Sequence, residues 1–336
     1  MEKKFDTYGI GNALVDIEFT VTEEQLLSLG VEKGLMTLVD ETVIEKITRS
    51  NELQSNHKSC GGSAGNTMIA LAQLGENSFY SCKVAADDFG KFFANELSLE
   101  GLSSNLSVGL GEGKTGQCMV FVTPDAERTM NTYLGITETF SENEIDFQAL
   151  KNSKILYVEG YLVTSTTGRA AAIKAIKFAR ENGIQTALTF SDPSMPTYFK
   201  SGLIEMLGEQ KVDLLFCNRE ELTVFTSESD IESALQKGAQ FAHAVVMTNG
   251  ADGAIFFDGK QMITASAPKI KPIDTIGAGD LFAGAFLYSY GIGHDIKTCL
   301  SFSCACASKV VTQYGSRLTK KDILQIKEKY LGMKNY

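Results

Sequence analysis

The sequence has few of the residues that mark metalloproteins, secreted proteins or membrane proteins. Its three histidines lie far apart and its seven cysteines include no Cys-x-x-Cys pair. No metal-ligand spacing is therefore present, and scattered thiols in odd number suit a reducing compartment. The N-terminus lacks the apolar core of a signal peptide, and no apolar run approaches the length of a membrane span. We expect a cytoplasmic protein that has no membrane partner.

Positive charge is also in deficit, since 31 Lys and Arg residues oppose 41 Asp and Glu residues and leave a net charge of −10. Such a chain lacks the basic surface by which proteins bind nucleic acid or anionic membranes. A small anionic ligand is still compatible with this charge, because backbone N–H groups can hold phosphate on their own. We expect a small-molecule ligand and no nucleic-acid partner.

Only five prolines are present, and no linker or repeat divides the 336 residues. Short apolar strands alternate with helices along most of the chain. The expected elements are strands over 8–19, 184–190, 212–217 and 244–247, helices over 169–182 and 231–243, and a hairpin of 254–257 with 262–265 around Asp258-Gly259. This alternation predicts one α/β domain over residues 1–336, with a mostly parallel sheet covered by helices on both faces.

The stretch GLGEGKTG, residues 109–116, looks like two phosphate-binding loops at once. A P-loop needs a glycine five positions before Gly113, and that position is Val108. The dinucleotide pattern GxGxxG is present but must be followed by a helix, whereas residues 117–122 are β-prone. A turn entering a strand is the favoured interpretation. A dinucleotide-dependent oxidoreductase, which rests on this loop alone, is disfavoured.

A better anion site lies at residues 274–286, DTIGAGDLFAGAF. Gly277, Ala278 and Gly279 are small enough for bare backbone to approach a ligand, and the apolar residues that follow begin a helix. N–H groups at a helix N-terminus attract an anion. Asp280, in the first turn, could accept the proton of a hydroxyl that attacks a phosphoryl group. The alternative is an aspartate that only caps the helix.

A second stretch, CGGSAGN at 60–66, precedes another helical pattern. Gly61 and Gly62 would let the backbone approach a polyol, and Asn66 offers a donor and an acceptor to a pair of hydroxyls. The alternative is an ordinary turn and helix cap.

At these two stretches the sequence resembles the ribokinase (PfkB) carbohydrate-kinase family, and the resemblance spans nearly the whole chain. Four family elements occur in the right order: GG…N at Gly61, Gly62 and Asn66, NxxE at Asn218 and Glu221, TxG at Thr248 and Gly250, and DTxGAGD at 274–280. The resemblance implies a ribokinase-like three-layer α/β sandwich. It also implies a small β lid, formed by insertions at about 17–40 and 108–134.

The resemblance assigns roles to these positions. Asp280 would be the general base, with Gly277, Ala278 and Gly279 completing the anion hole. ATP and magnesium would be the cofactors: Asn218 and Glu221 would organise magnesium through water, and Thr248, Gly250 and Gly253 would border the ATP site. Asp274 resembles a ligand of the monovalent cation, potassium, that many members carry. Ile276 departs from the family, in which threonine or asparagine is common.

The acceptor side resembles the adenosine-kinase branch, through the GxGNxxxD pattern that includes Asn12 and Asp16. Asp16 would hold sugar hydroxyls, and Tyr161 would stack on a nucleobase; a core tyrosine is the alternative. Arg128 resembles an arginine that reaches the phosphates, although a surface arginine is equally compatible.

These assignments predict an ATP-dependent kinase for the primary hydroxyl of a nucleoside or ribose-type sugar. A fructose, hexose or ribose kinase of the same family is the alternative within the class, and a catalytically silent regulatory homologue is the alternative outside it. Family members of this branch are commonly monomeric, whereas others form homodimers through the lid.

The assignment of 109–116 to the lid gives a first prediction. Lys114→Ala should leave the affinity for ATP nearly unchanged, because its ammonium group does not face the phosphates. Isothermal titration of ATP into the variant and the parent protein measures this. A large loss of ATP affinity would restore the phosphate-loop interpretation.

Overall fold

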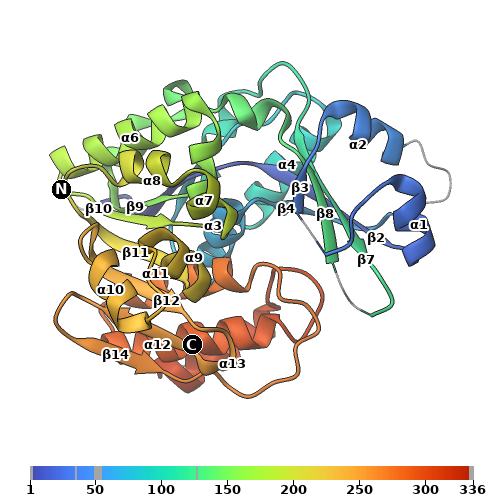
Figure 1. The fold of residues 1–336 in the computed structure, drawn as a ribbon. Coiled ribbons are helices and arrows are strands. Elements are labelled where there is room, and N and C mark those ends of the chain that lie inside the picture. Colours follow the sequence, from blue (N-terminus) through green and yellow to red (C-terminus); the bar gives the residue numbers. More distant parts are fainter. Residues whose placement is uncertain (1–2, 35, 49–54, 126–127, 333–336) are drawn as a thin grey trace.

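The computed structural model describes residues 3–34, 36–48, 55–125 and 128–332, without the side chain of Asn56. Residues 35, 126 and 127 of the predicted lid lie outside the described residues. Figure 1 shows a large layered body and a smaller sheet that projects from it. No helix within the described ranges is long and apolar enough to cross a membrane.

The large body is built on a sheet of nine described strands in the order β14-β13-β12-β11-β10-β9-β1-β5-β6. The strands are β1 Phe5–Ile10, β5 Phe79–Ser81, β6 Ser103–Ser104, β9 Ser153–Val158, β10 Gln185–Thr189, β11 Val212–Asn218, β12 Ala242–Thr248, β13 Ala254–Phe257 and β14 Met262–Ala265. All neighbours pair in parallel except β12 with β13 and β13 with β14. The mostly parallel sheet and the hairpin are confirmed.

Helices cover both faces of this sheet, which confirms the three-layer sandwich (Figure 1). One layer contains α3 Ser63–Gln73, α4 Asp88–Leu99, α11 Ala278–Gly291, α12 Ile296–Val310 and α13 Lys320–Leu331; the other contains α5 Phe147–Lys151, α6 Thr166–Glu181, α7 Ser194–Tyr198, α8 Lys200–Leu207, α9 Arg219–Thr226 and α10 Ile231–Gly238. In β11, Leu214 and Phe216 enter the first core while Leu215 and Cys217 enter the second. Burial on both faces explains why the strands read as continuous apolar runs.

The smaller sheet has the order β3-β8-β7-β2-β4. Its strands are β2 Leu14–Thr20, β3 Met36–Leu38, β4 Ser55–Gly61, β7 Gly116–Val122 and β8 Arg128–Tyr133, with helices α1 Glu23–Leu29 and α2 Glu41–Thr48 beside them. One face is apolar and packs through residues such as Ile17 and Phe121 into the main core. The opposite face presents Asp16 and Glu18 beside Cys118 and Val120 in register.

Three predicted boundaries are wrong. The sheet includes β4, which lies beyond the predicted insertion at 17–40. The strand expected over 8–19 is two strands of different sheets, because the chain crosses over at Gly11, where a Cβ would lie 2.4 Å from Glu159 Oε2. The helix expected over 231–243 ends at Gly238, since Ala242 already pairs with Val212 of β11.

Candidate active site

Asp280 lies in the first turn of α11, on the side of the large body that faces the smaller sheet. The helix begins after Gly277, whose φ of +73° is left-handed, and a Cβ there would lie 2.4 Å from the Cβ of Ser316. A glycine is therefore required on both counts. No described side chain caps this 14-residue helix. The N–H of Ala278 donates to the carbonyl oxygen of Thr275 at 3.3 Å, so the N–H groups of Gly279 and Asp280 are the ones left to face an anion, as expected for the predicted anion hole.

Two side chains from the first turn of α3 hold the Asp280 carboxylate. Ser63 Oγ donates to Oδ1 at 2.7 Å, and Asn66 Nδ2 donates to Oδ2 at 3.1 Å. Ser316 Oγ in turn donates to Asn66 Oδ1 at 3.0 Å. Burial raises the pKa of Asp280 to about 6, against the opposing effect of the bonds from Ser63 and Asn66. The carboxylate is oriented by donors while its affinity for a proton stays high, which suits a general base.

Asp16 approaches the same region from the smaller sheet. Burial raises its pKa to about 7; the charge of Arg317 opposes this rise and the charge of Asp280 adds to it. A Cβ on Gly61 would lie 2.1 Å from Asp16 Oδ1, so the neighbouring strand must carry glycine for the carboxylate to fit. The structure therefore brings together the predicted sugar carboxylate and the predicted base, 264 residues apart in the sequence, one on strand β2 of the smaller sheet and the other in the first turn of α11.

Asn12 and the start of α3 are both fixed by Glu159, a residue to which the sequence pattern assigned no role. Glu159 Oε1 accepts from the backbone N and the Nδ2 of Asn12 at 3.2 and 3.1 Å, and Oε2 accepts from the N of Ala64 at 2.7 Å. Burial raises the pKa of Glu159 to about 7, opposed by these bonds. A charged residue that directly follows the apolar strand over 154–158 is the signal that could have identified it.

Gly62 lies where the start of α3 passes the segment that contains Asn12. It precedes α3 with a φ of +88°, and a Cβ at this position would lie 2.2 Å from the carbonyl oxygen of Asn12. Only glycine allows the two segments to pass this closely. The predicted residues Asn12, Gly61, Gly62 and Asn66 therefore lie around Asp16 and Asp280.

Asn218 and Glu221 form a capping box at the start of α9. Asn218 Oδ1 accepts from the N of Glu221, while both carboxylate oxygens of Glu221 accept from Asn218. Burial raises the pKa of Glu221 to about 7, and the charges of Asp192 and Asp280 raise it further. No group of three His, Cys, Asp or Glu side chains suited to a metal occurs in the described ranges. A divalent cation bound through water would relieve this repulsion, so the residues fit magnesium in that mode.

Thr248 is the last residue of β12, and Gly250 and Gly253 lie in the turn that follows the strand. Thr248 is the register partner of Asn218 in the neighbouring strand. Gly253 has a φ of +107°, and a Cβ there would lie 1.9 Å from the carbonyl oxygen of Ala265. This glycine is therefore required by the packing of the loop as well as by any ligand nearby.

Tyr161 and Ile276 are both partly buried, and Tyr161 packs against the core beneath α6 to α10. Tyr161 lies half-buried in the 3-10 turn Gly160–Thr164, and burial together with the charges of Asp192 and Glu159 raises the pKa of its hydroxyl. Ile276 packs against the face of the smaller sheet formed by Cys118, Val120 and Val122. This contact explains why position 276 carries an apolar isoleucine, whereas threonine or asparagine is common there in the family that the sequence resembles.

Arg128 contacts Asp274, which belongs to the loop that leads into α11. Its Nη2 is 2.8 Å from Asp274 Oδ2, and its Nη1 is 3.1 Å from Glu18 Oε2. The two predicted roles, a phosphate contact for the arginine and a cation ligand for the aspartate, thus fall on two residues that contact each other.

The glycine-rich loop 109–116 lies apart from Asp280. Lys114 Nζ is paired with Glu41 and, at 2.9 Å, with Glu45 of α2. Asp87, at the start of α4, accepts from the backbone N of Thr115 at 2.8 Å and from its hydroxyl at 2.6 Å. These bonds tie the loop to α2 and to the start of α4.

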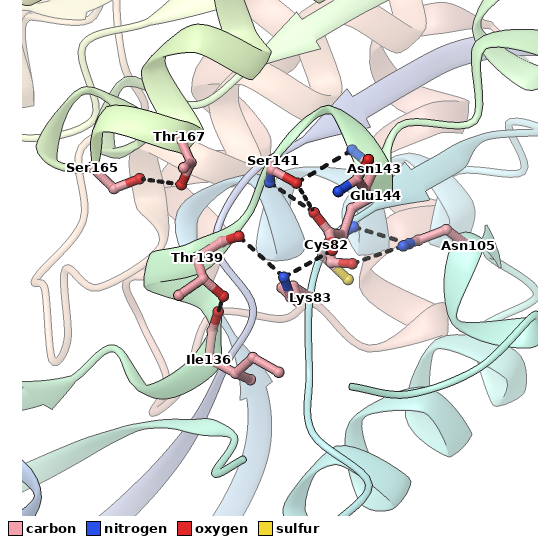
Figure 2. Close-up of polar contacts among 10 residues, drawn as sticks. All are labelled: Cys82, Lys83, Asn105, Ile136, Thr139, Ser141, Asn143, Glu144, Ser165 and Thr167. Atoms are coloured by element: carbon pink, nitrogen blue, oxygen red, sulfur yellow. Dashed lines mark hydrogen bonds and ion pairs between the residues drawn. The ribbon is translucent and has the colours of Figure 1, made fainter. Parts of the chain in front are cut away.

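A surface depression of about 610 Å³ lies under this loop. Figure 2 shows the other lysine of its wall, Lys83, donating to the carbonyl oxygen of Thr139 at 3.1 Å and lying 2.9 Å from Glu144. Because Lys83 and Lys114 are both paired with carboxylates, the depression offers no free ammonium group to a phosphate.

Comparisons with known proteins agree with this geometry. A model of the pfkB family of carbohydrate kinases matches residues 35–323. The adenosine kinase from Sinorhizobium meliloti is 31% identical, with a TM-score of 0.86 over 94% of this chain and 96% of its own. A probable sugar kinase from Rhizobium etli is 30% identical, with a TM-score of 0.89 over 97% and 98% of the two chains. The 5-dehydro-2-deoxygluconokinase of Bacillus subtilis is 25% identical over 94% of this chain and 92% of its own length.

The contact between Gly61 and Asp16 predicts the effect of a single methyl group. Gly61→Ala should lower the free energy of unfolding by about 1–3 kcal/mol, because the new Cβ must displace the Asp16 carboxylate. Urea denaturation measures the change. Gly291→Ala is the matched control, since a Cβ there meets nothing within 4 Å. Equal stability of the two variants would contradict the close contact.

Proposed function

The chain belongs to the pfkB family of carbohydrate kinases, and from that premise we propose that it transfers the γ-phosphoryl group of ATP to the primary hydroxyl of a ribose-containing nucleoside. One observation carries the proposal. Asp280, with its pKa near 6, lies at the uncapped N-terminus of α11 and within electrostatic reach of Asp16 on the smaller sheet. A base, an anion hole and a carboxylate for hydroxyl binding thus converge on one region.

In the proposed reaction the acceptor hydroxyl gives its proton to Asp280 as its oxygen attacks the γ-phosphorus. Ser63 and Asn66 keep the carboxylate oriented for this transfer. The N–H groups of the Gly277–Asp280 turn stabilise negative charge on the transferring oxygens. Magnesium, organised through water by Asn218 and Glu221, would neutralise charge on the phosphates of an ATP bordered by Thr248, Gly250 and Gly253.

Asp16 is the proposed ligand of the ribose hydroxyls. Its pKa near 7 reflects a carboxylate that burial deprives of water, and two vicinal hydroxyls would supply the missing donors. Asn66 acts mainly on Asp280, because its amide oxygen and one amide hydrogen are already bonded. Asn12 lines the same part of the site and is held in place by its bonds to Glu159.

Two features favour a neutral acceptor with a base over an anionic sugar acid. The site-facing side of the smaller sheet is apolar at Cys118, Val120 and Met130, and the half-buried ring of Tyr161 could stack on a base. Among the described cations, Arg128 and Arg317 lie nearest Asp16, and both already bind carboxylates, Arg317 at Glu96. An anionic sugar acid would have to compete with these carboxylates for either arginine. A hexose or ribose remains the second candidate, on the strength of the family alone.

A panel of acceptors tests the substrate class. With ATP and magnesium, ADP release should be fastest with adenosine or another nucleoside, slower with ribose and fructose, and absent with 5′-deoxyadenosine, which lacks the accepting hydroxyl. Reaction confined to free hexoses or to 5-dehydro-2-deoxygluconate would overturn the nucleoside assignment. Failure of every acceptor to release ADP would instead favour a regulatory homologue.

The role of Asp280 predicts a charge and pH effect. Asp280→Asn should lower kcat by about 10²–10⁴-fold, because an amide cannot accept the proton. In the parent protein kcat/KM should fall as the pH drops through about 6, where the base becomes protonated. Ser63→Ala should shift the acidic fall of kcat/KM to higher pH, because the Ser63 hydroxyl stabilises the charged carboxylate and its loss raises the pKa of Asp280.

Steady-state assays from pH 5 to 8 measure these effects. Asp88→Asn, at a fully exposed side chain in the first turn of α4, is the matched control and should behave like the parent protein. Undiminished turnover in Asp280→Asn would exclude Asp280 as the base.

A further inference from the structure

Asp274 begins the loop that leads into α11, and its side chain is completely shielded from solvent. Its two oxygens each accept one backbone bond, Oδ1 from the N of Ile276 at 3.0 Å and Oδ2 from the N of Gly315 at 2.9 Å. Backbone donors orient the carboxylate but do not neutralise it. A nearby cation offsets the cost of removing this charge from water.

Arg128 supplies that cation from a distant part of the chain. Its side chain is only 10% exposed, and Nη2 lies 2.8 Å from Asp274 Oδ2. Glu18 holds Nη1 at 3.1 Å, and the guanidinium carbon lies 5.8 Å from the centre of the Tyr314 ring. The guanidinium is therefore held on three sides, by Asp274, Glu18 and Tyr314. A permanently charged, planar group suits such a pairing better than a lysine would.

This arrangement disagrees with the cation site that the family resemblance implies. The residue expected to bind potassium has both oxygens bonded to backbone donors, and a guanidinium already lies 2.8 Å from Oδ2. We propose that the guanidinium of Arg128 is the resident cation of Asp274, so that the loop before α11 is held in place without a monovalent metal ion.

The proposal gives Arg128 a positioning role in place of a phosphate contact. Arg128 belongs to β8 and Glu18 to β2, whereas Asp274 belongs to the loop that ends in Gly277 and Asp280. The ion pair therefore joins the smaller sheet to the anion-hole loop. Movement of the guanidinium onto a phosphate would leave the buried Asp274 without a cationic partner.

Thermal unfolding of the parent protein tests the proposal without any variant. The Tm should be the same in potassium chloride and in tetramethylammonium chloride at equal ionic strength, because no potassium ion binds at Asp274. A saturable rise of Tm with potassium that disappears in Asp274→Asn would overturn the proposal. This measurement requires no substrate, so its outcome is independent of the proposed acceptor.

Removal of the guanidinium should create a potassium requirement. Arg128→Met should lower the Tm in tetramethylammonium by about 5 °C or more, through the unpaired buried charge, and potassium should restore part of that loss. Arg128→Lys should retain more stability than Arg128→Met. In the double variant Arg128→Met/Asp274→Asn the potassium effect should vanish.

Arg169→Met, which removes a half-exposed arginine paired with Glu205 at 3.4 Å, is the matched control and should respond equally to both salts. The same potassium response in Arg169→Met as in Arg128→Met would refute the assignment to Asp274, as would an Arg128→Met variant that is equally stable in both salts. If Arg128→Met does not fold, the parent protein and Asp274→Asn still decide between the two cations.

Discussion

Glu159, at the end of β9, uses both oxygens of one buried carboxylate to hold two other segments of the chain. The bonds to Asn12 fix the point at which the chain leaves the large sheet for the smaller one, and the bond to Ala64 fixes the first turn of α3. Ser63 and Asn66 in that turn then orient Asp280. The positions of the base and of the smaller sheet relative to each other therefore depend on a residue that has no chemical step of its own.

Such a site is costly, because it gathers acids in a region poor in water. The pKa values of Asp16, Glu159 and Glu221 all rise to about 7, and that of Asp280 rises to about 6, with burial as the first cause in each case. Hydrogen-bond donors and two arginines offset part of this cost. The part of the burial cost that is not offset favours the binding of ligands that supply hydrogen-bond donors or positive charge, such as sugar hydroxyls at Asp16 or a hydrated divalent cation near Glu221.

Periodicity and short motifs were enough to predict the large sheet, its helical layers and the residues around Asp280. Strands buried on both faces give continuous apolar runs, and the glycines at 61, 62 and 277 lie where a Cβ would meet the Asp16 carboxylate, the Asn12 carbonyl oxygen and Ser316 respectively. β4 escaped prediction because its sequence, SNHKSCG, has no apolar alternation. The break between β1 and β2 escaped because apolar residues continue across it, and only contacts with Glu159 and Ala64 force the chain to turn at Gly11. Glu159 itself and the Arg128–Asp274 pair depend on contacts between distant residues, which no local pattern records.

Two features that look unrelated in the sequence have the same origin in the structure. Ile276 is apolar because its neighbours on the smaller sheet are Cys118, Val120 and Val122, and Asp274 is paired because β8 of that sheet begins with Arg128. Both residues belong to the loop that precedes α11, so this loop contacts the smaller sheet through one apolar and one ionic contact only two residues apart. The loop's conformation and the position of the smaller sheet are consequently coupled. A displacement of either must break a buried ion pair or expose apolar surface, and the anion hole at Gly277 directly adjoins that contact.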